Sequence, residues 1–136
     1  MSINIYLTFN GNCREAMEFY QQCLGGELKF QTIGNTPLVE KLPTEMKAYI
    51  LNAELVNTDL IIMASDMVGE NGLLIGNAMA IMLKCKSEEE LKDCYSKLAV
   101  GGMQLQSIAL TNWNTLLGAL TDKYGNNWML YYQPTA

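Results

Sequence analysis

Residues 10–30 have the sequence N-G-N-C-R-E-A-M-E-F-Y-Q-Q-C-L-G-G-E-L-K-F, which predicts a helix that ends at two glycines and leads into a strand. Asn12 is a good helix N-cap, and Glu15 follows at the position from which its carboxylate can bond back to the cap. Gly25 and Gly26 end the helix because glycine readily adopts the left-handed conformation. The apolar residues recur at helical spacing and form one face: Ala16, Phe19, Tyr20, Cys23 and Leu24.

The same pattern returns in the second half of the chain. Ser87 and Glu90 form a capping box, and Gly101 and Gly102 follow the helix before a strand that begins at Met103. The apolar face has the same spacing as before: Leu91, Cys94, Tyr95, Leu98 and Ala99. Cap, apolar face and paired glycines occur together twice, which indicates a repeated supersecondary unit.

Eight further segments have the alternation or the short apolar runs that are typical of strands. They are Ile3–Phe9, Glu27–Ile33, Lys47–Val56, Leu60–Ser65, Ala78–Cys85, Met103–Leu110, Leu116–Thr121 and Trp128–Gln133. Each half therefore has the order β-α-β-β-β, and residues 34–45, with two of the three prolines, are predicted to form a loop. We predict an α+β fold of two βαβββ modules, which form a cup-shaped, mostly antiparallel sheet with the helices on its outer face.

The 136-residue chain is expected to be a single domain. Its modules are predicted at about residues 1–66 and 78–136, with the glycine-rich segment 67–77 as the connector. The longest apolar run, Ala78–Leu83, is too short to cross a bilayer, and the N-terminus has no leader-like pattern. We therefore expect a cytoplasmic protein without a membrane partner.

Charge and composition exclude several classes of partner and site. The net charge is −5, which argues against nucleic acid and against an anionic membrane surface. The chain has no histidine, which removes most metal sites and much acid–base machinery. Its four cysteines form no C-x-x-C pair and are expected to be buried thiols. We expect no metal and no cofactor.

Motifs along nearly the whole chain resemble the PhnB-like branch of the vicinal oxygen chelate superfamily, which includes glyoxalase I, extradiol dioxygenases and bleomycin-resistance proteins. These motifs are Tyr6–Asn12, Glu15–Tyr20 with Leu24–Gly26, Asn52–Leu55, Met63–Asp66 and Leu120–Leu130. The resemblance implies that two modules form a cup and that the protein is a homodimer.

In metal-dependent members of this superfamily, His, Glu or Gln side chains hold a divalent metal that the substrate chelates. Here Asn52 stands where PhnB-like proteins often have histidine, and Met129 lies near the place of a glutamate on the last strand. Methionine is a poor ligand for hard divalent ions, so an intact His/Glu site is not expected. Some relatives carry a demethylubiquinone methyltransferase label, but this chain has no Gly-rich strand-to-helix loop suited to a nucleotide-like methyl donor.

Six residues are candidates for lining the cup: Tyr6, Thr8, Asn52, Glu54, Trp113 and Met129. The alternative for Tyr6, Thr8, Asn52 and Glu54 is a solvated sheet face or an edge. The alternative for Met129 is ordinary core filling, and that for Trp113 is a loop tryptophan packed over the core. Glu54 would be a candidate base if it were enclosed, because desolvation raises the pKa of a carboxyl group. Asp66 and Glu70 are expected to be solvated charges, and Trp128 to lie in the core or at a dimer contact.

The function that fits best is binding of a small organic ligand in the cup without a His-based metal site, with no catalytic residue assigned. The alternative is an enzyme of the same superfamily, a metal-assisted lyase, isomerase or dioxygenase that uses Glu54. A dimeric scaffold without a ligand is the third possibility. Ser65 is not expected to act as a nucleophile, because no histidine or placed lysine is there to take its proton.

Overall fold

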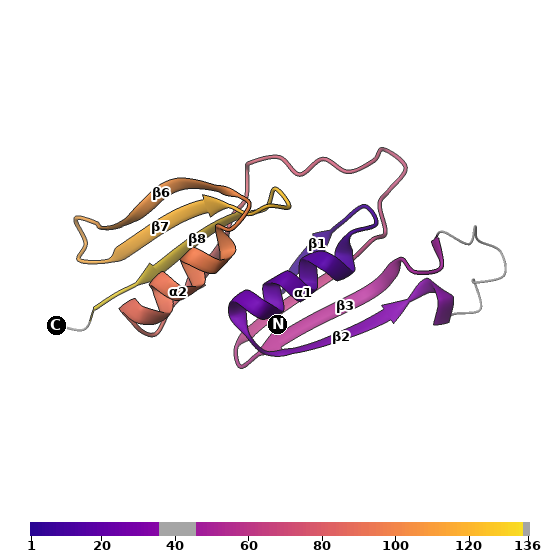
Figure 1. Cartoon of the computed structure of the whole chain (residues 1–136), viewed down its shortest axis with the longest axis horizontal. Helices are drawn as coiled ribbons and strands as arrows, with labels where there is room; N and C mark the ends of the chain where they lie inside the picture. The colour runs from indigo at the N-terminus through magenta and orange to yellow at the C-terminus, as the bar shows by residue number, and fades with distance from the viewer. Residues whose placement is uncertain (36–45, 135–136) are drawn as a thin grey trace. The chain divides into compact units, whose positions relative to one another are not determined.

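The computed structural model describes residues 1–35 and 46–134, which form two compact units, Met1–Leu74 and Ile75–Ala136 (Figure 1). The first unit contains β1 (Ile5–Thr8), α1 (Cys13–Leu24), β2 (Glu27–Thr32), a 3-10 turn (Ile33–Asn35), β3 (Ile50–Asn57) and β4 (Leu60–Ser65). The second unit contains β5 (Ile81–Lys84), α2 (Glu88–Leu98), β6 (Met103–Leu110), β7 (Leu116–Thr121) and β8 (Asn127–Tyr132).

The two units have the same sheet topology, which confirms two βαβββ modules. Their strand orders are β1-β4-β3-β2 and β5-β8-β7-β6. In each sheet the first strand pairs in parallel with the last, and the other two pairings are antiparallel. The chain therefore has an α+β fold of two mixed four-stranded sheets. A cup shared by the two sheets stays a prediction.

The predicted segments agree closely with the observed elements where the apolar pattern is regular. β4, β6 and β7 have the predicted bounds. The predicted strands 47–56 and 78–85 start too early, since β3 begins at Ile50 and β5 at Ile81. Of the predicted loop 34–45, residues 36–45 lie outside the described residues.

Each helix covers one face of the sheet in its own unit (Figure 1). The buried face of α1 consists of Cys13, Ala16, Met17, Tyr20 and Cys23, and that of α2 of Leu91, Cys94, Tyr95 and Leu98. Under α2, the Tyr95 hydroxyl donates to the carbonyl oxygens of Gln106 (2.8 Å) and Ala119 (3.1 Å). Gly118 makes room for this ring, because a Cβ there would lie 2.8 Å from it.

The two helices begin in different ways. At α2, Ser87 Oγ accepts from the Glu90 N–H (3.0 Å), as predicted, while the Glu90 carboxylate accepts from the Lys86 N–H (2.7 Å) instead of the cap N–H. The capping box predicted at α1 is wrong, because the Asn12 side chain makes no cap hydrogen bond. The backbone of Asn12, with φ −111° and ψ 20°, lacks the extended conformation of a usual N-cap.

Asp66, which follows β4, occupies the start of α1 instead. Its Oδ1 accepts from the N–H groups of Gly11 and Cys13, both at 2.9 Å, and its Oδ2 accepts from the Ile50 N–H at 2.8 Å. The side chain is only 4% exposed, so the expectation of a solvated charge is wrong for Asp66. The carboxylate offers enough acceptor sites for three backbone donors, and it joins the ends of β1 and β4 to the start of β3. Glu70 is exposed, as expected.

The second glycine of each Gly-Gly pair lies against the backbone of the turn between the last two strands of its unit. A Cβ on Gly26 would lie 2.5 Å from the Val56 carbonyl oxygen, and one on Gly102 would overlap the Thr121 carbonyl oxygen. The first glycines, Gly25 and Gly101, have positive φ angles of 75° and 76°. Gly25 is thus the C-cap of α1, and Gly101 turns the chain shortly after the Ala99 cap of α2, while the second member of each pair permits a close backbone approach.

All four cysteines are buried, as expected, and the structure gives no disulfide among its described residues. Burial, assisted by the charge of Asp66, raises the pKa of the Cys13 thiol to about 12. Burial also raises the pKa of Cys85 to about 12, with the neighbouring Cys94 and Glu90 adding to the effect. These thiols remain protonated at neutral pH and are therefore poor nucleophiles. No helix among the described residues is long and apolar enough to cross a membrane.

Candidate functional site

The sheet of the second unit has one face covered by α2 and one open face. Trp128, Leu120 and Leu130 are buried on the covered side. Because side chains alternate along a strand, the residues next to them in sequence lie on the open face. The strand register places two neighbouring rows there: Met82, Met129 and Ala119 in one row, and Lys84, Tyr131 and Leu117 in the next.

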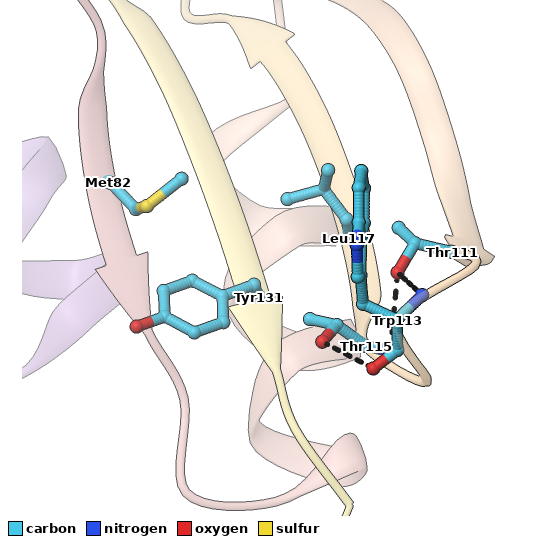
Figure 2. A pocket seen from close by; sticks show the side chains of 6 residues that line it. All are labelled: Met82, Thr111, Trp113, Thr115, Leu117 and Tyr131. Atoms are coloured by element: carbon cyan, nitrogen blue, oxygen red, sulfur yellow. Dashed lines mark hydrogen bonds between the residues drawn. The ribbon is translucent and has the colours of Figure 1, made fainter.

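A pocket of about 300 Å³ lies on this open face (Figure 2). It is open to solvent and almost wholly apolar. Figure 2 shows that Met82 and Tyr131 project from β5 and β8, while Leu117 on β7 lies beside the Trp113 indole from the β6–β7 loop. The lining residues are Met82, Thr111, Trp113, Thr115, Leu117 and Tyr131.

The loop that carries Trp113 is held by hydrogen bonds from both of its ends. Thr111 Oγ1 accepts from the N–H groups of Trp113 (3.2 Å) and Thr115 (3.3 Å), and the Thr111 N–H donates to the Thr115 carbonyl oxygen (2.8 Å). Asn114 has a positive φ of 59°, which closes this short hairpin loop. The backbone is therefore fixed, yet the Trp113 side chain is 79% exposed. Packing over the core, one of the two expectations for Trp113, is thus wrong.

Four of the predicted cup residues lie together on the open face of the first unit. Tyr6 and Glu54 are in one row with Met63 between them, and Thr8 and Asn52 lie on the same side of the sheet. The Tyr6 hydroxyl donates to Ser65 Oγ at 2.7 Å. The Tyr6 side chain is 55% exposed, and the other three are half-buried. The use of Glu54 as a base, which depends on its enclosure, stays a prediction.

The remaining two candidates are on the second unit. Trp113 forms part of the pocket, and Met129 lies next to the lining residue Met82 in the same row. Five lining residues are not among the six candidates: Met82, Thr111, Thr115, Leu117 and Tyr131. Strand alternation already places Met82, Leu117 and Tyr131 on one face, but the pairing register is needed to bring them together.

The neighbours of Glu54 and of Met129 do not form the ligand set with which metal-dependent superfamily members hold a divalent ion. Glu54 has Lys29 and Met63 as its cross-strand neighbours, and Met129 has Met82 and Ala119. These side chains supply one carboxylate among amines, thioethers and methyl groups, whereas hard divalent ions require several oxygen ligands. In the described part of the chain, no three His, Cys, Asp or Glu residues group together in a way that could hold a metal ion.

The turn from β1 into α1 has N–H groups that could bind an anion, but a side chain of the protein already occupies them. Helix N-termini bind phosphate or carboxylate groups through their unpaired N–H groups. Here the N–H groups of Gly11 and Cys13 already donate to the carboxylate of Asp66. The protein thus supplies its own anion at this helix end.

Comparisons with known proteins agree with the fold and extend over almost the whole chain. Protein YjdN from Escherichia coli K12 is 29% identical over 140 residues, which cover 96% of this chain and 94% of that protein. The crystal structure of protein PA1353 from Pseudomonas aeruginosa matches with 33% identity and a TM-score of 0.82 over 98% of each chain. A PhnB protein from Bacillus cereus matches with 27% identity and a TM-score of 0.75 over 97% of this chain and 99% of that one.

More distant structures share the fold alone. The fosfomycin resistance protein FosX from Listeria monocytogenes has a TM-score of 0.66 at 12% identity, over 98% of this chain and 93% of its own.

The family model described as 3-demethylubiquinone-9 3-methyltransferase matches residues 1–131. The chain therefore belongs to this family of PhnB-like proteins, whose fold is that of the glyoxalase/bleomycin resistance/dioxygenase superfamily.

Proposed function

We propose that the protein binds a small organic ligand in the pocket between Trp113 and Tyr131. The observation that carries this proposal is the indole of Trp113, which a hydrogen-bonded loop holds in an exposed position beside Leu117. An exposed aromatic side chain on a fixed backbone offers a large contact area, and it has only two side-chain torsions to order on binding. The pocket volume of about 300 Å³ is at the lower end of the usual range for ligand sites, about 300–1,000 Å³.

The lining favours binding over chemistry. None of the six residues carries a carboxylate, an amine or an imidazole. Met82 adds a flexible, polarisable thioether that can adjust to ligands of different shape and contact their aromatic rings. The FosX structure, which shares the fold, belongs to a protein named for resistance to a small antibiotic, and this supports a small-molecule role for the fold.

Trp113→Ala is expected to weaken binding of a neutral apolar dye such as Nile red by at least about tenfold. This factor corresponds to the loss of one buried aromatic contact, about 1.5–3 kcal/mol. Dye fluorescence titrations measure the change. Val100→Ala is a matched control, because Val100 is exposed and follows α2, on the covered side of the sheet. Equal affinities of Trp113→Ala and the wild type would contradict the proposal.

We further propose that the protein is a homodimer, with β6 of one chain against β6 of its partner. β6 is an edge strand without a single charged residue, and Met103, Leu105 and Leu110 on it are each more than half exposed. Such edges tend to pair with another chain.

Leu105→Lys is expected to convert the dimer into monomers, because the substitution would put an unpaired, buried charge into the contact on each side of the twofold axis. Analytical ultracentrifugation should give twice the chain mass of 15.2 kDa for the wild type and the single mass for the variant. Gln31→Lys, on the corresponding edge strand β2, should remain dimeric. A wild type that is monomeric at 100 µM would refute the dimer. The cytoplasmic location stays a prediction.

A further inference from the structure

The sheet of the second unit carries a single charged side chain, Lys84. The sequences of its strands are IMLK, MQLQSIAL, LLGALT and NWMLYY, and the pocket loop Thr111–Thr115 adds no charge. Lys84 is the last residue of β5 and is exposed. It follows Met82 by two positions and therefore lies on the same face, and its register partner on β8 is Tyr131. The one cation of this sheet thus adjoins two residues of the pocket lining.

The charge of Lys84 is also left without a counter-charge in the second unit. The structure gives Lys84 no ion pair within the described residues, and the ion pairs that it does give both lie along α2. These pairs, Lys92 with Glu88 and Lys97 with Asp93, are on the helix that covers the opposite face. The protein as a whole has a net charge of −5, which repels anions. Lys84 makes the open face of this sheet locally positive although the protein as a whole is negative.

A cation at the edge of an apolar pocket selects ligands by charge as well as by shape. A ligand that covers the apolar lining would displace water from one side of the lysine, and this would strengthen the attraction between the lysine and the anionic group of the ligand. A charge-assisted contact of this kind is worth more than a contact between two fully solvated ions. The apolar residues meanwhile bind the body of the ligand.

We infer that the pocket takes an apolar or aromatic molecule that carries an anionic group, with the ring against Trp113 and the anion at Lys84. This inference rests on the proposed function and names the class of ligand. Carboxylate, sulfonate and phosphonate groups share the required chemistry.

The test compares two ligands of the same shape, 2-naphthoate and the neutral 2-naphthamide, by isothermal titration calorimetry at low salt. The wild type is expected to bind 2-naphthoate about 5–10 times more tightly, and the ratio should fall as salt screens the lysine. Lys84→Gln should bring the two affinities together. Lys92→Gln, which changes the net charge equally on the α2 side, should keep the wild-type ratio. Naphthalene-2-sulfonate then distinguishes a carboxylate from a larger oxyanion.

Each outcome separates the inference from the function on which it rests. Equal binding of 2-naphthoate and 2-naphthamide to the wild type would overturn the anionic ligand and leave the apolar pocket intact. If Lys92→Gln lowers the ratio of the affinities for 2-naphthoate and 2-naphthamide as much as Lys84→Gln does, the role of Lys84 is overturned. If neither ligand binds and Trp113→Ala leaves dye binding unchanged, the proposed function fails as well.

Discussion

Asp66→Asn is expected to lower the free energy of unfolding of the first unit by about 2–4 kcal/mol. The Asp66 carboxylate accepts three backbone hydrogen bonds, from Gly11, Cys13 and Ile50, and it is almost fully buried. An asparagine can offer its one oxygen to Gly11 and Cys13, but its NH₂ group then faces the Ile50 N–H. One buried donor is left without an acceptor and one charge-assisted contact is lost, while the volume of the side chain hardly changes.

Urea unfolding separates the effects of this substitution on the two units. Both tryptophans, Trp113 and Trp128, belong to the second unit, so tryptophan fluorescence reports that unit while circular dichroism reports both. We expect the circular dichroism transition of Asp66→Asn to move to lower urea. Asp59→Asn is the matched control, because Asp59 is exposed in the β3–β4 turn of the same unit. A difference below about 0.5 kcal/mol between Asp66→Asn and the wild type would contradict a structural role for the buried carboxylate.

Gly102→Ala is expected to destabilise the second unit by at least about 3 kcal/mol. The added methyl group would overlap the Thr121 carbonyl oxygen and lie 2.9 Å from the Asp122 Cα. This backbone cannot easily move, because the Asp122 N–H donates to the Asn126 carbonyl oxygen (2.8 Å) and its Oδ2 accepts from the Trp128 Nε1–H (2.8 Å). Strain at Gly102 is therefore transmitted to the bond that fixes the buried Trp128.

The fluorescence of Trp128, which is 1% exposed, measures this effect directly. In Gly102→Ala its emission should shift to longer wavelength at lower urea than in the wild type. Gly69→Ala is the control, because a Cβ on Gly69 meets no atom within 4 Å. A Gly102→Ala variant as stable as Gly69→Ala would show that the turn between β7 and β8 yields to the methyl group.

The sequence predicted those features that depend on neighbours along the chain. Apolar spacing located both helices, and strand alternation located β4, β6 and β7 with their observed bounds. The role of Asp66 could not be predicted, because its bond to Cys13 joins residues 53 positions apart. The local rule instead assigned the cap to Asn12. Likewise, the pocket depends on which strands pair in which register, and this register places Tyr131 beside Lys84.

The parallel pairing of the first strand with the last has a consequence for how each half folds. The backbone groups of β1 gain their strand partners only when β4 is in place, and those of β5 only when β8 is in place. Contacts between such distant segments slow folding, because a long loop has to close first. During synthesis on the ribosome, β1 therefore emerges long before residues 60–65, which complete its sheet. Each module can close only when nearly all of it has been made.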